Sequence, residues 1–399
     1  MSVDIRRPIS MARRWGPRAL VVGALALFST ASSAAEPVKL GLMLPYTGTY
    51  AALGEAITNG LKLAIEQSGN RLGGREVEYV VVDSEANPGK APQNMNRLVV
   101  GDKADVIIGP VHSGVAMGML KVARQEGALM IIPNAGLNVA TRQLCAPNIF
   151  RTSFSAWQTA YPMGQMAYDR GFRKVVTIAW KYSFGTESLE AFEESFKAAG
   201  GEVVKQILTP FPEVEFQSYL TEIASLKPDA VFAFYAGGGA VKFVKDYAAA
   251  GLKDSIPLMG SGFLTDGTLK AQGDAATGVL TTLHYADGLD NPTNTAFRKA
   301  YADAYGTQAD IYAVQGYDTG LLLVKAFAAV NGATDDQKAL IAAMEGAWID
   351  SPRGAWIFSK AHNPIQPVYL REVQNGANVV LRVAGEAVND PATGCAMAE

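Results

Sequence analysis

Short apolar segments alternate with helix-like segments through most of the chain, and this alternation restricts the fold more than any other feature. Residues 38–45 (VKLGLMLP) predict a strand, and residues 57–65 predict a helix because their apolar positions recur at helical spacing. Gly73 and Gly74 end this helix before the next predicted strand, residues 76–83. Strands joined by helices in this way predict an α/β fold with parallel sheets and right-handed crossovers.

The same unit occurs a second time in the middle of the chain. A strand over residues 174–180 is followed by the loop KYSFG, a helix over residues 189–199 and a second Gly-Gly pair before Glu202. The shared order suggests two similar lobes, although chance matching of α/β units gives the same pattern. Further strands are predicted at residues 105–110, 128–133, 230–235, 257–262 and 278–285.

The last third of the chain changes character. Helices are predicted near residues 294–305, 313–330 and 335–344. Two segments of alternating residues, 366–373 and 378–383, flank Asn375-Gly376, which is typical of a tight β-hairpin turn.

The first 35 residues predict a secretory signal peptide. Five arginines (Arg6, Arg7, Arg13, Arg14 and Arg18) precede an apolar run over residues 19–28, and small residues follow as far as Ala35. The alternative is a membrane anchor, but the run is about half of the ~20 residues needed to span a bilayer. We expect cleavage near Ala35, which leaves 364 of the 399 residues. At roughly 100 to 200 residues per domain, this length predicts two domains.

The charge of the chain excludes some partners. Removing residues 1–35 takes away five arginines and one aspartate, so that 30 basic and 37 acidic residues remain, with a net charge of −7. An acidic chain is not expected to bind nucleic acid.

The two cysteines, Cys145 and Cys395, predict one disulfide if the chain is exported, and two free thiols are the alternative. None of the three histidines (His112, His284 and His362) stands at a metal-ligand spacing from a cysteine, so no metal site is predicted.

Two other classes of protein are less well supported. The sequence has no GxSxG, HExxH or Walker A pattern, and Gly237-Gly238-Gly239 is not GxGxxG, so neither an enzyme nor a cofactor is predicted. A membrane receptor with a sensor domain of this kind would need an apolar span after the lobes. We find no such span before Glu399.

Several strings together resemble the leucine/isoleucine/valine-binding family, the type I periplasmic solute-binding proteins of bacterial ABC transporters. They are KLGLMLPYTGTYAALGEAITNGLKLAIE, VIIGPVHSGVAMGM, MIIPNAG, WKYSFG and GLKDSIPLMGSG. Their order and spacing cover nearly all of the chain after residue 35.

The resemblance implies two doubly wound parallel-sheet lobes joined by three crossing strands, near Ser155, Tyr285 and Leu370. The lobes would be residues 36–155 plus 286–370, and residues 156–285 plus 371–399. It implies a periplasmic protein that closes on one small ligand and delivers it to a membrane permease. We expect a monomer.

Candidate ligand residues of the first lobe lie on loops that follow predicted strands. Ser113, after His112, begins a helix, so it is either a ligand donor beside the helix amides or a plain N-cap. In the family, the serine that matches Ser113 binds the ligand carboxylate. The resemblance adds the backbone of a second loop and one apolar residue after the first strand: Asn134, Ala135, Gly136 and Leu53.

Candidates in the second lobe are mostly aromatic. Phe184 matches a ligand-facing tyrosine of the family, and Tyr182 precedes it; either ring is alternatively part of the core. Tyr235 and Ala236 end a strand where small residues leave room. Trp157 is either a packing residue or a lid over the cleft.

One departure from the family pattern concerns the ligand. Members that bind α-amino acids often carry an acid where this chain has Gly262, followed by Phe263. A buried ammonium without a carboxylate costs several kcal/mol, so an amino acid would need another acid, such as Asp287 or Asp318. We therefore expect an aromatic carboxylate, with a branched-chain amino acid as the alternative.

Overall fold

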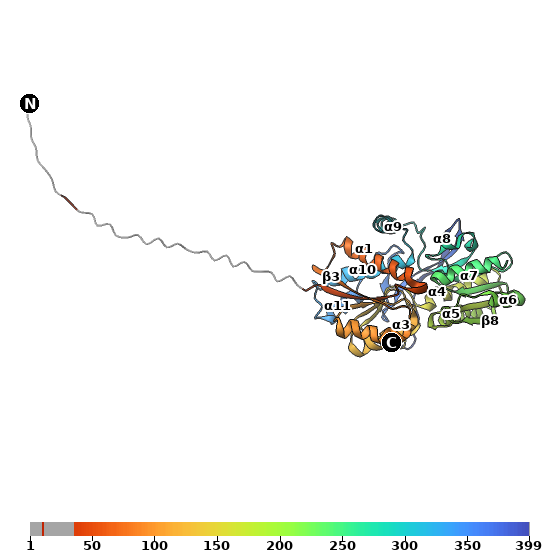
Figure 1. Cartoon of the computed structure of the whole chain (residues 1–399), viewed down its shortest axis with the longest axis horizontal. Coiled ribbons are helices and arrows are strands. Elements are labelled where there is room, and N and C mark those ends of the chain that lie inside the picture. The colour runs from red at the N-terminus through yellow and green to blue at the C-terminus, as the bar shows by residue number, and fades with distance from the viewer. Residues whose placement is uncertain (1–9, 12–35, 399) are drawn as a thin grey trace, which may run out of the picture. The chain divides into compact units, whose positions relative to one another are not determined.

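The computed structural model describes residues 10–11 and 36–398. The predicted signal peptide, residues 1–35, lies outside this range apart from residues 10 and 11. Residues 36–398 fold into two α/β lobes, each built on its own sheet (Figure 1).

The sheet of the first lobe is formed by β1 (Val38–Leu44), β2 (Arg71–Leu72), β3 (Arg75–Asp83), β4 (Val106–Ile108), β5 (Met130–Ile132) and β6 (Ile149–Arg151). Their order across the sheet is β2-β3-β1-β4-β5-β6. All neighbours are parallel except β2, which pairs antiparallel with β3.

The sheet of the second lobe is formed by β7 (Lys174–Trp180), β8 (Glu202–Thr209), β9 (Ala230–Phe234), β10 (Leu258–Ser261), β11 (Leu280–Leu283), β12 (Ile357–Phe358), β13 (Pro364–Gln374) and β14 (Ala377–Val388). Their order is β12-β13-β11-β10-β9-β7-β8, and β14 pairs with β13. The strands β7 to β11 are parallel to their neighbours, whereas β13 is antiparallel to β11 and to β14.

The helices are α1 (Ala51–Gln67), α2 (Ala91–Asn96), α3 (Ser113–Glu126), α4 (Ala156–Asp169), α5 (Ser183–Ala198), α6 (Gln217–Leu226), α7 (Gly237–Ala249), α8 (Leu269–Gln272), α9 (Pro292–Tyr305), α10 (Ile311–Ala329) and α11 (Gln337–Glu345). Figure 1 shows α10, from the last third of the chain, beside α1 in the first lobe. The helices predicted in this last third therefore complete the first lobe.

Helices cover both faces of the first sheet, because its central strand β1 is apolar on both sides. Leu42 packs in one core with Leu61 of α1 and Phe327 of α10. Met43, the next residue, points to the other face and packs with Met119 of α3. This arrangement is the doubly wound α/β fold that the sequence predicts.

The repeated unit of the sequence has the same structure in both lobes. In the first copy, α1 connects β1 to the parallel strand β3. In the second copy, α5 connects β7 to the parallel strand β8.

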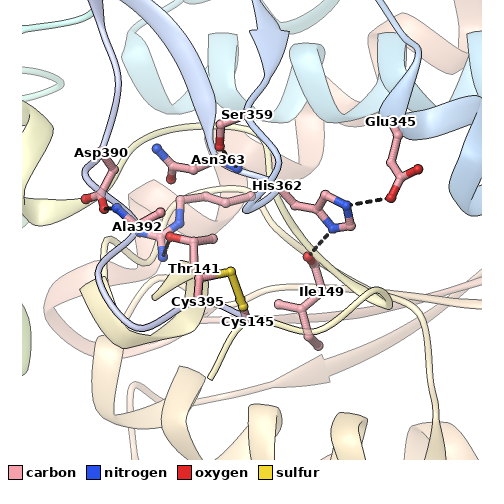
Figure 2. Close-up of a disulfide and its surroundings, with 11 residues drawn as sticks. Thr141, Cys145, Ile149, Glu345, Ser359, His362, Asn363, Asp390, Ala392 and Cys395 are labelled. Carbon is pink, nitrogen blue, oxygen red and sulfur yellow. Dashed lines mark hydrogen bonds and ion pairs between the residues drawn. A yellow bond between two sulfur atoms is a disulfide. The ribbon is translucent and has the colours of Figure 1, made fainter. Parts of the chain in front are cut away.

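The chain passes between the lobes after β6, after β11 and after β12; the backbone of β12 extends the second sheet beside β13, but the side chain of its residue Phe358 packs in the core of the first lobe with Leu42. Leu370, which the sequence places at the third crossing, lies opposite Thr282 of β11, inside the second sheet. We therefore propose that this crossing lies at residues 359–363, where the imidazole of His362 contacts the carbonyl of Ile149 at 3.0 Å and the carboxylate of Glu345 at 2.9 Å (Figure 2). The corresponding lobe limits are residues 36–155 plus 286–363, and 156–285 plus 364–388.

The tail after β14 returns to the first lobe and does not stay with the second. Cys395 forms a disulfide with Cys145, which follows the last short helical turn of the first lobe (Figure 2). The buried carboxylate of Asp390 accepts hydrogen bonds from Arg142 at 2.8 Å and from the hydroxyl of Ser155 at 2.5 Å. The tail is thus fixed where the first crossing begins.

Candidate ligand-binding site

A small cavity of about 20 Å³ lies between the two lobes. Most of its wall is aromatic: Tyr50, Phe154, Tyr182, Phe184, Phe234, Phe263 and Tyr312. The rest is provided by Leu53, Val111, Asn134, Gly136 and Ala236. A volume of about 20 Å³ has room for about one water molecule, far below the ~300–1,000 Å³ usual for ligand sites, so the aromatic side chains of the wall must move apart to admit a ligand.

The cavity lies beyond the carboxyl ends of parallel strands from both sheets. Val111 follows β4 and Asn134 follows β5, while Phe234 ends β9 and Phe263 follows β10. Loops at this edge of an α/β sheet are the usual position for ligands.

Direct contacts join the lobes around the cavity. The hydroxyl oxygens of Tyr50 and Tyr182, one from each lobe, lie 2.9 Å apart. The backbone N–H of Asn138 in the first lobe donates to the carboxylate of Glu187 in the second, at 2.8 Å. The structure therefore corresponds to a closed arrangement of the lobes.

The cavity wall carries no charge: within residues 36–398, neither an acidic nor a basic side chain lines it. The two acids that could have completed an amino-acid site lie elsewhere. Asp318 is buried in an ion pair with Arg353, at 2.6 Å between oxygen and nitrogen. Asp287 lines a separate crevice beside Arg298.

The three tyrosine hydroxyls of the wall are hydrogen-bond donors at physiological pH. Burial raises the pKa of Tyr182, and it raises the pKa of Tyr50 and Tyr312 well above the usual value of 10.0. None of the three therefore ionises near neutral pH.

Ser113 begins α3 two residues after the lining residue Val111 and does not itself line the cavity; it is completely buried, and its hydroxyl has no hydrogen-bond partner among the described residues. The cap of this helix is instead His112, whose Nδ1 accepts from the N–H of Gly114 at 3.0 Å. Burial lowers the pKa of His112 to about 4, so its ring is neutral. The ring stacks on Tyr182 at 4.3 Å between centroids and lies behind the cavity wall.

The second predicted loop of the first lobe contributes through two of its three residues. Asn134 and Gly136 line the cavity, and the side-chain N–H of Asn134 donates to Gln315 at 2.7 Å. The amide of Ala135 is already bonded to the carbonyl of Pro110, at 3.0 Å. Gly136 must be a glycine, because a Cβ there would lie 2.2 Å from the ring of Phe184.

The remaining sequence candidates divide into two groups. The structure brings Leu53, Tyr182, Phe184, Ala236 and Phe263 to the cavity wall. Three others are not part of that wall: Trp157, Tyr235 and Gly262.

These three residues have other surroundings. Trp157, on α4, stacks on Tyr161 and lines a groove outside the cavity. The hydroxyl of Tyr235 contacts Thr209 in the core of the second lobe. Gly262 adjoins Arg371, whose guanidinium donates to its carbonyl at 3.3 Å.

Five wall residues are missing from the sequence interpretation: Tyr50, Val111, Phe154, Phe234 and Tyr312. Val111 and Tyr50 stand within loops that the sequence marks as ligand loops. Phe234 could have been found from strand alternation, since it precedes Tyr235 and points to the opposite side. Tyr312 begins α10, and no sequence signal places that helix end at the cavity.

Comparison with known proteins gives consistent results. A family model described as periplasmic binding protein matches residues 37–378. A protein of Brucella melitensis named "Leu/Ile/Val-binding protein homolog 6" is 34% identical over 363 residues, which are 89% of this chain and 92% of that protein.

Two solved structures are similar throughout. An ABC-transporter solute-binding protein of Rhodopseudomonas palustris in complex with benzoate is 52% identical, with a TM-score of 0.89 over 90% of this chain and 99% of that one. A second one, from strain BisB5 in complex with 3,4-dihydroxybenzoic acid, is 33% identical, with a TM-score of 0.84 over 89% of this chain and 99% of that one.

The described residues contain no helix that is long and apolar enough to cross a membrane. Three observations lead to one assignment. They are the two lobes with parallel sheets, the cavity at the carboxyl ends of the strands and the family match over most of the chain. The chain belongs to the periplasmic binding protein family.

Proposed function

We propose that this protein is the periplasmic solute-binding component of an ABC importer and that it captures an aromatic carboxylate between its lobes. The observation that carries the proposal is the cavity wall, which is mainly aromatic and has no charged side chain. A ring gains from burial among such side chains, whereas an ammonium group would be buried without a carboxylate. The benzoate and dihydroxybenzoate complexes of the two similar structures support the same class of ligand.

The ligand carboxylate is assigned to the Ser113 end of the site. The hydroxyl of Ser113 is buried without a partner among the described residues, close in the chain to the lining residue Val111, and the first-turn amides of α3 favour a negative group. The loop with Asn134 and Gly136 lies at the next strand end and adds polar backbone. His112 is neutral, so the carboxylate would be held by uncharged donors.

The proposed mechanism is capture by lobe closure, without a chemical step. Ligand contacts from both lobes stabilise the closed state, together with the Tyr50–Tyr182 and Asn138–Glu187 contacts. A membrane permease would then recognise the closed form and accept the ligand. We expect the protein to act as a monomer, without a cofactor or nucleic acid.

A branched-chain amino acid is the second candidate, suggested by the name of the Brucella relative. Its ammonium group has no acid to pair with in this cavity, because Asp318 is held by Arg353 and Asp287 lies in another crevice. We expect a difference of a few kcal/mol in favour of an aromatic acid, the scale of an unpaired buried charge.

Titration calorimetry of the mature protein with benzoate, hydroxybenzoates, leucine, isoleucine and valine tests this proposal. A thermal-shift screen can precede it, since a ligand at ~100 times its Kd adds about 2.7 kcal/mol of stability. We expect heat from the aromatic acids and little from the amino acids. Micromolar binding of leucine without any binding of aromatic acids would contradict the proposal.

A further inference from the structure

Tyr312 is the wall residue whose polar group the fold itself does not use. Its side chain is 1% exposed and lines the cavity, and its hydroxyl has no hydrogen-bond partner among the described residues. A buried hydroxyl without a partner is costly, so such a group in a cavity wall is expected to bond to a ligand.

Tyr312 lines the cavity from the start of α10, whereas Ser113 begins α3, a different helix, two residues after the lining residue Val111. Tyr312 rises from the start of α10, and its ring packs against Phe263, with 6.1 Å between the ring centroids. Gly267, four residues after Phe263 in the second lobe, is also close: a Cβ on it would lie 3.4 Å from the Tyr312 ring. Ser113, by contrast, starts α3 in the first lobe, next to the capping His112.

Phe263, which packs against Tyr312, forms an apolar cluster with two further wall residues, Phe154 and Phe184. The centroid of Phe154 lies 4.7 Å from that of Phe263 and 5.8 Å from that of Phe184. An aromatic ring among these side chains, with its carboxylate at Ser113, would direct its far edge toward another wall. Tyr312 offers the free polar group on such a wall.

The two other tyrosines of the wall do not bond to the hydroxyl of Tyr312. Tyr50 and Tyr182 share one hydrogen bond between their hydroxyls, whereas no hydrogen bond joins either of them to Tyr312. Tyr312 can therefore donate to, or accept from, a ligand without breaking a bond of the protein.

We propose that Tyr312 is a specificity-determining residue that selects benzoates with a hydroxyl group on the ring away from the carboxylate, at the 3- or 4-position. This inference rests on the proposed function and extends it from aromatic acids to hydroxylated ones. Benzoate leaves the Tyr312 hydroxyl unpaired, while a hydroxybenzoate pairs it. A site built to pair with a ligand hydroxyl discriminates against the analogue that lacks the group.

Calorimetry with benzoate and with 2-, 3- and 4-hydroxybenzoate, on the wild-type protein and on Tyr312→Phe, tests the assignment. We expect the wild type to bind 3- or 4-hydroxybenzoate about tenfold more tightly than benzoate, a change of about 1.4 kcal/mol. Tyr312→Phe should abolish this preference and leave benzoate affinity within about twofold. The 2-hydroxy isomer, with its hydroxyl beside the carboxylate, should behave like benzoate.

Tyr247→Phe is the matched control, because the hydroxyl of Tyr247 donates to the carbonyl of Ile256 at 2.8 Å, outside the cavity. It should keep the preference, and thermal unfolding should show that both variants fold. The inference is overturned if Tyr312→Phe weakens benzoate as much as hydroxybenzoates, or if the wild type prefers benzoate. If no aromatic acid binds the wild type, the proposed function itself fails.

Discussion

The hydroxyl oxygens of Tyr50 and Tyr182 lie 2.9 Å apart and connect the two lobes directly beside the cavity. Tyr50 comes from the loop after β1, and Tyr182 precedes α5, so the bond exists only when the lobes are closed. Closure and ligand binding therefore share this contact.

Tyr50→Phe and Tyr182→Phe should each weaken ligand binding, because each leaves one buried hydroxyl without its partner, at a cost of about 1–3 kcal/mol. The double variant should lose less than the sum of the two single losses, since it leaves neither hydroxyl behind. Calorimetry on the four proteins of this double-mutant cycle measures the coupling. Strictly additive losses would show that the bond does not contribute to closure.

Ser113→Ala should reduce the affinity for the aromatic acid by about 1.5 to 3 kcal/mol, the scale of a hydrogen bond to a charged group. The melting temperature should hardly change, because the hydroxyl of Ser113 bonds to no other described residue. Ser188→Ala is the control: its hydroxyl is also buried and unpartnered among the described residues, but it lies within α5 of the second lobe and not at the start of α3, next to the lining residue Val111. Unchanged affinity in Ser113→Ala would remove Ser113 from the site.

Gly136→Ala should abolish or strongly weaken binding while the protein remains folded. The new Cβ would lie 2.2 Å from the ring of Phe184 and 2.8 Å from that of Phe154, so both rings would have to move. Because the cavity is small, such movement removes ligand volume. The control Gly288→Ala places its Cβ in open space and should bind normally. Equal affinities of the two variants would contradict the close packing described for Gly136.

Binding should weaken as the pH rises, because of Glu187. Burial raises the pKa of this carboxyl from 4.5 to about 7 in the closed form, despite the hydrogen bond from Asn138 and the nearby Arg151. A raised carboxyl pKa favours the closed form fully below pH 4.5, and this advantage is lost as the pH rises toward 7 and beyond.

If Glu187 titrates normally in the open form, affinity should fall by about tenfold between pH 6 and pH 8. Glu187→Gln keeps a hydrogen-bond acceptor for the Asn138 amide and should flatten this part of the profile. Calorimetry at several pH values measures the affinity of both proteins. An equally steep fall of affinity with pH in Glu187→Gln would show that another group causes the pH dependence.

Reducing the Cys145–Cys395 disulfide should lower the free energy of unfolding by about 2 to 5 kcal/mol, because the bond closes a loop over a sequence separation of 250 residues. The variant Cys145→Ser with Cys395→Ser should melt at a similar temperature with and without reductant. Two titratable thiols in the denatured, unreduced wild-type protein would rule out the bond.

The sequence predicts the lobes and the strand ends well, because these features follow from local patterns. Hydrophobic periodicity and Gly-Gly stops locate both βαβ units, and Asn375-Gly376 lies in the turn between β13 and β14. The third crossing is harder to place. Leu370 lies within a long strand whose pairing with β11 depends on residues that are nearly 90 positions away, as the pair Leu370–Thr282 illustrates.

The sequence predicts only some of the residues that line the cavity, because whether a residue lines it depends on the direction of its side chain. Tyr235 and Phe234 are equally plausible from composition, but only Phe234 faces the cavity, while the Tyr235 hydroxyl contacts Thr209. Tyr312 reaches the cavity through the packing of α10 against the second lobe. That contact joins distant segments and leaves no local pattern.

If the chain is exported unfolded, as the proposed periplasmic function allows, the bond between Cys145 and Cys395 also sets an order of events during export. Because 250 positions separate the two cysteines, both sheets must be synthesised and translocated before Cys395 is available to react. In an oxidising compartment, Cys145 must therefore remain a thiol, or pair transiently with an oxidant, while the lobes emerge. A formed disulfide would then report that translocation has passed residue 395.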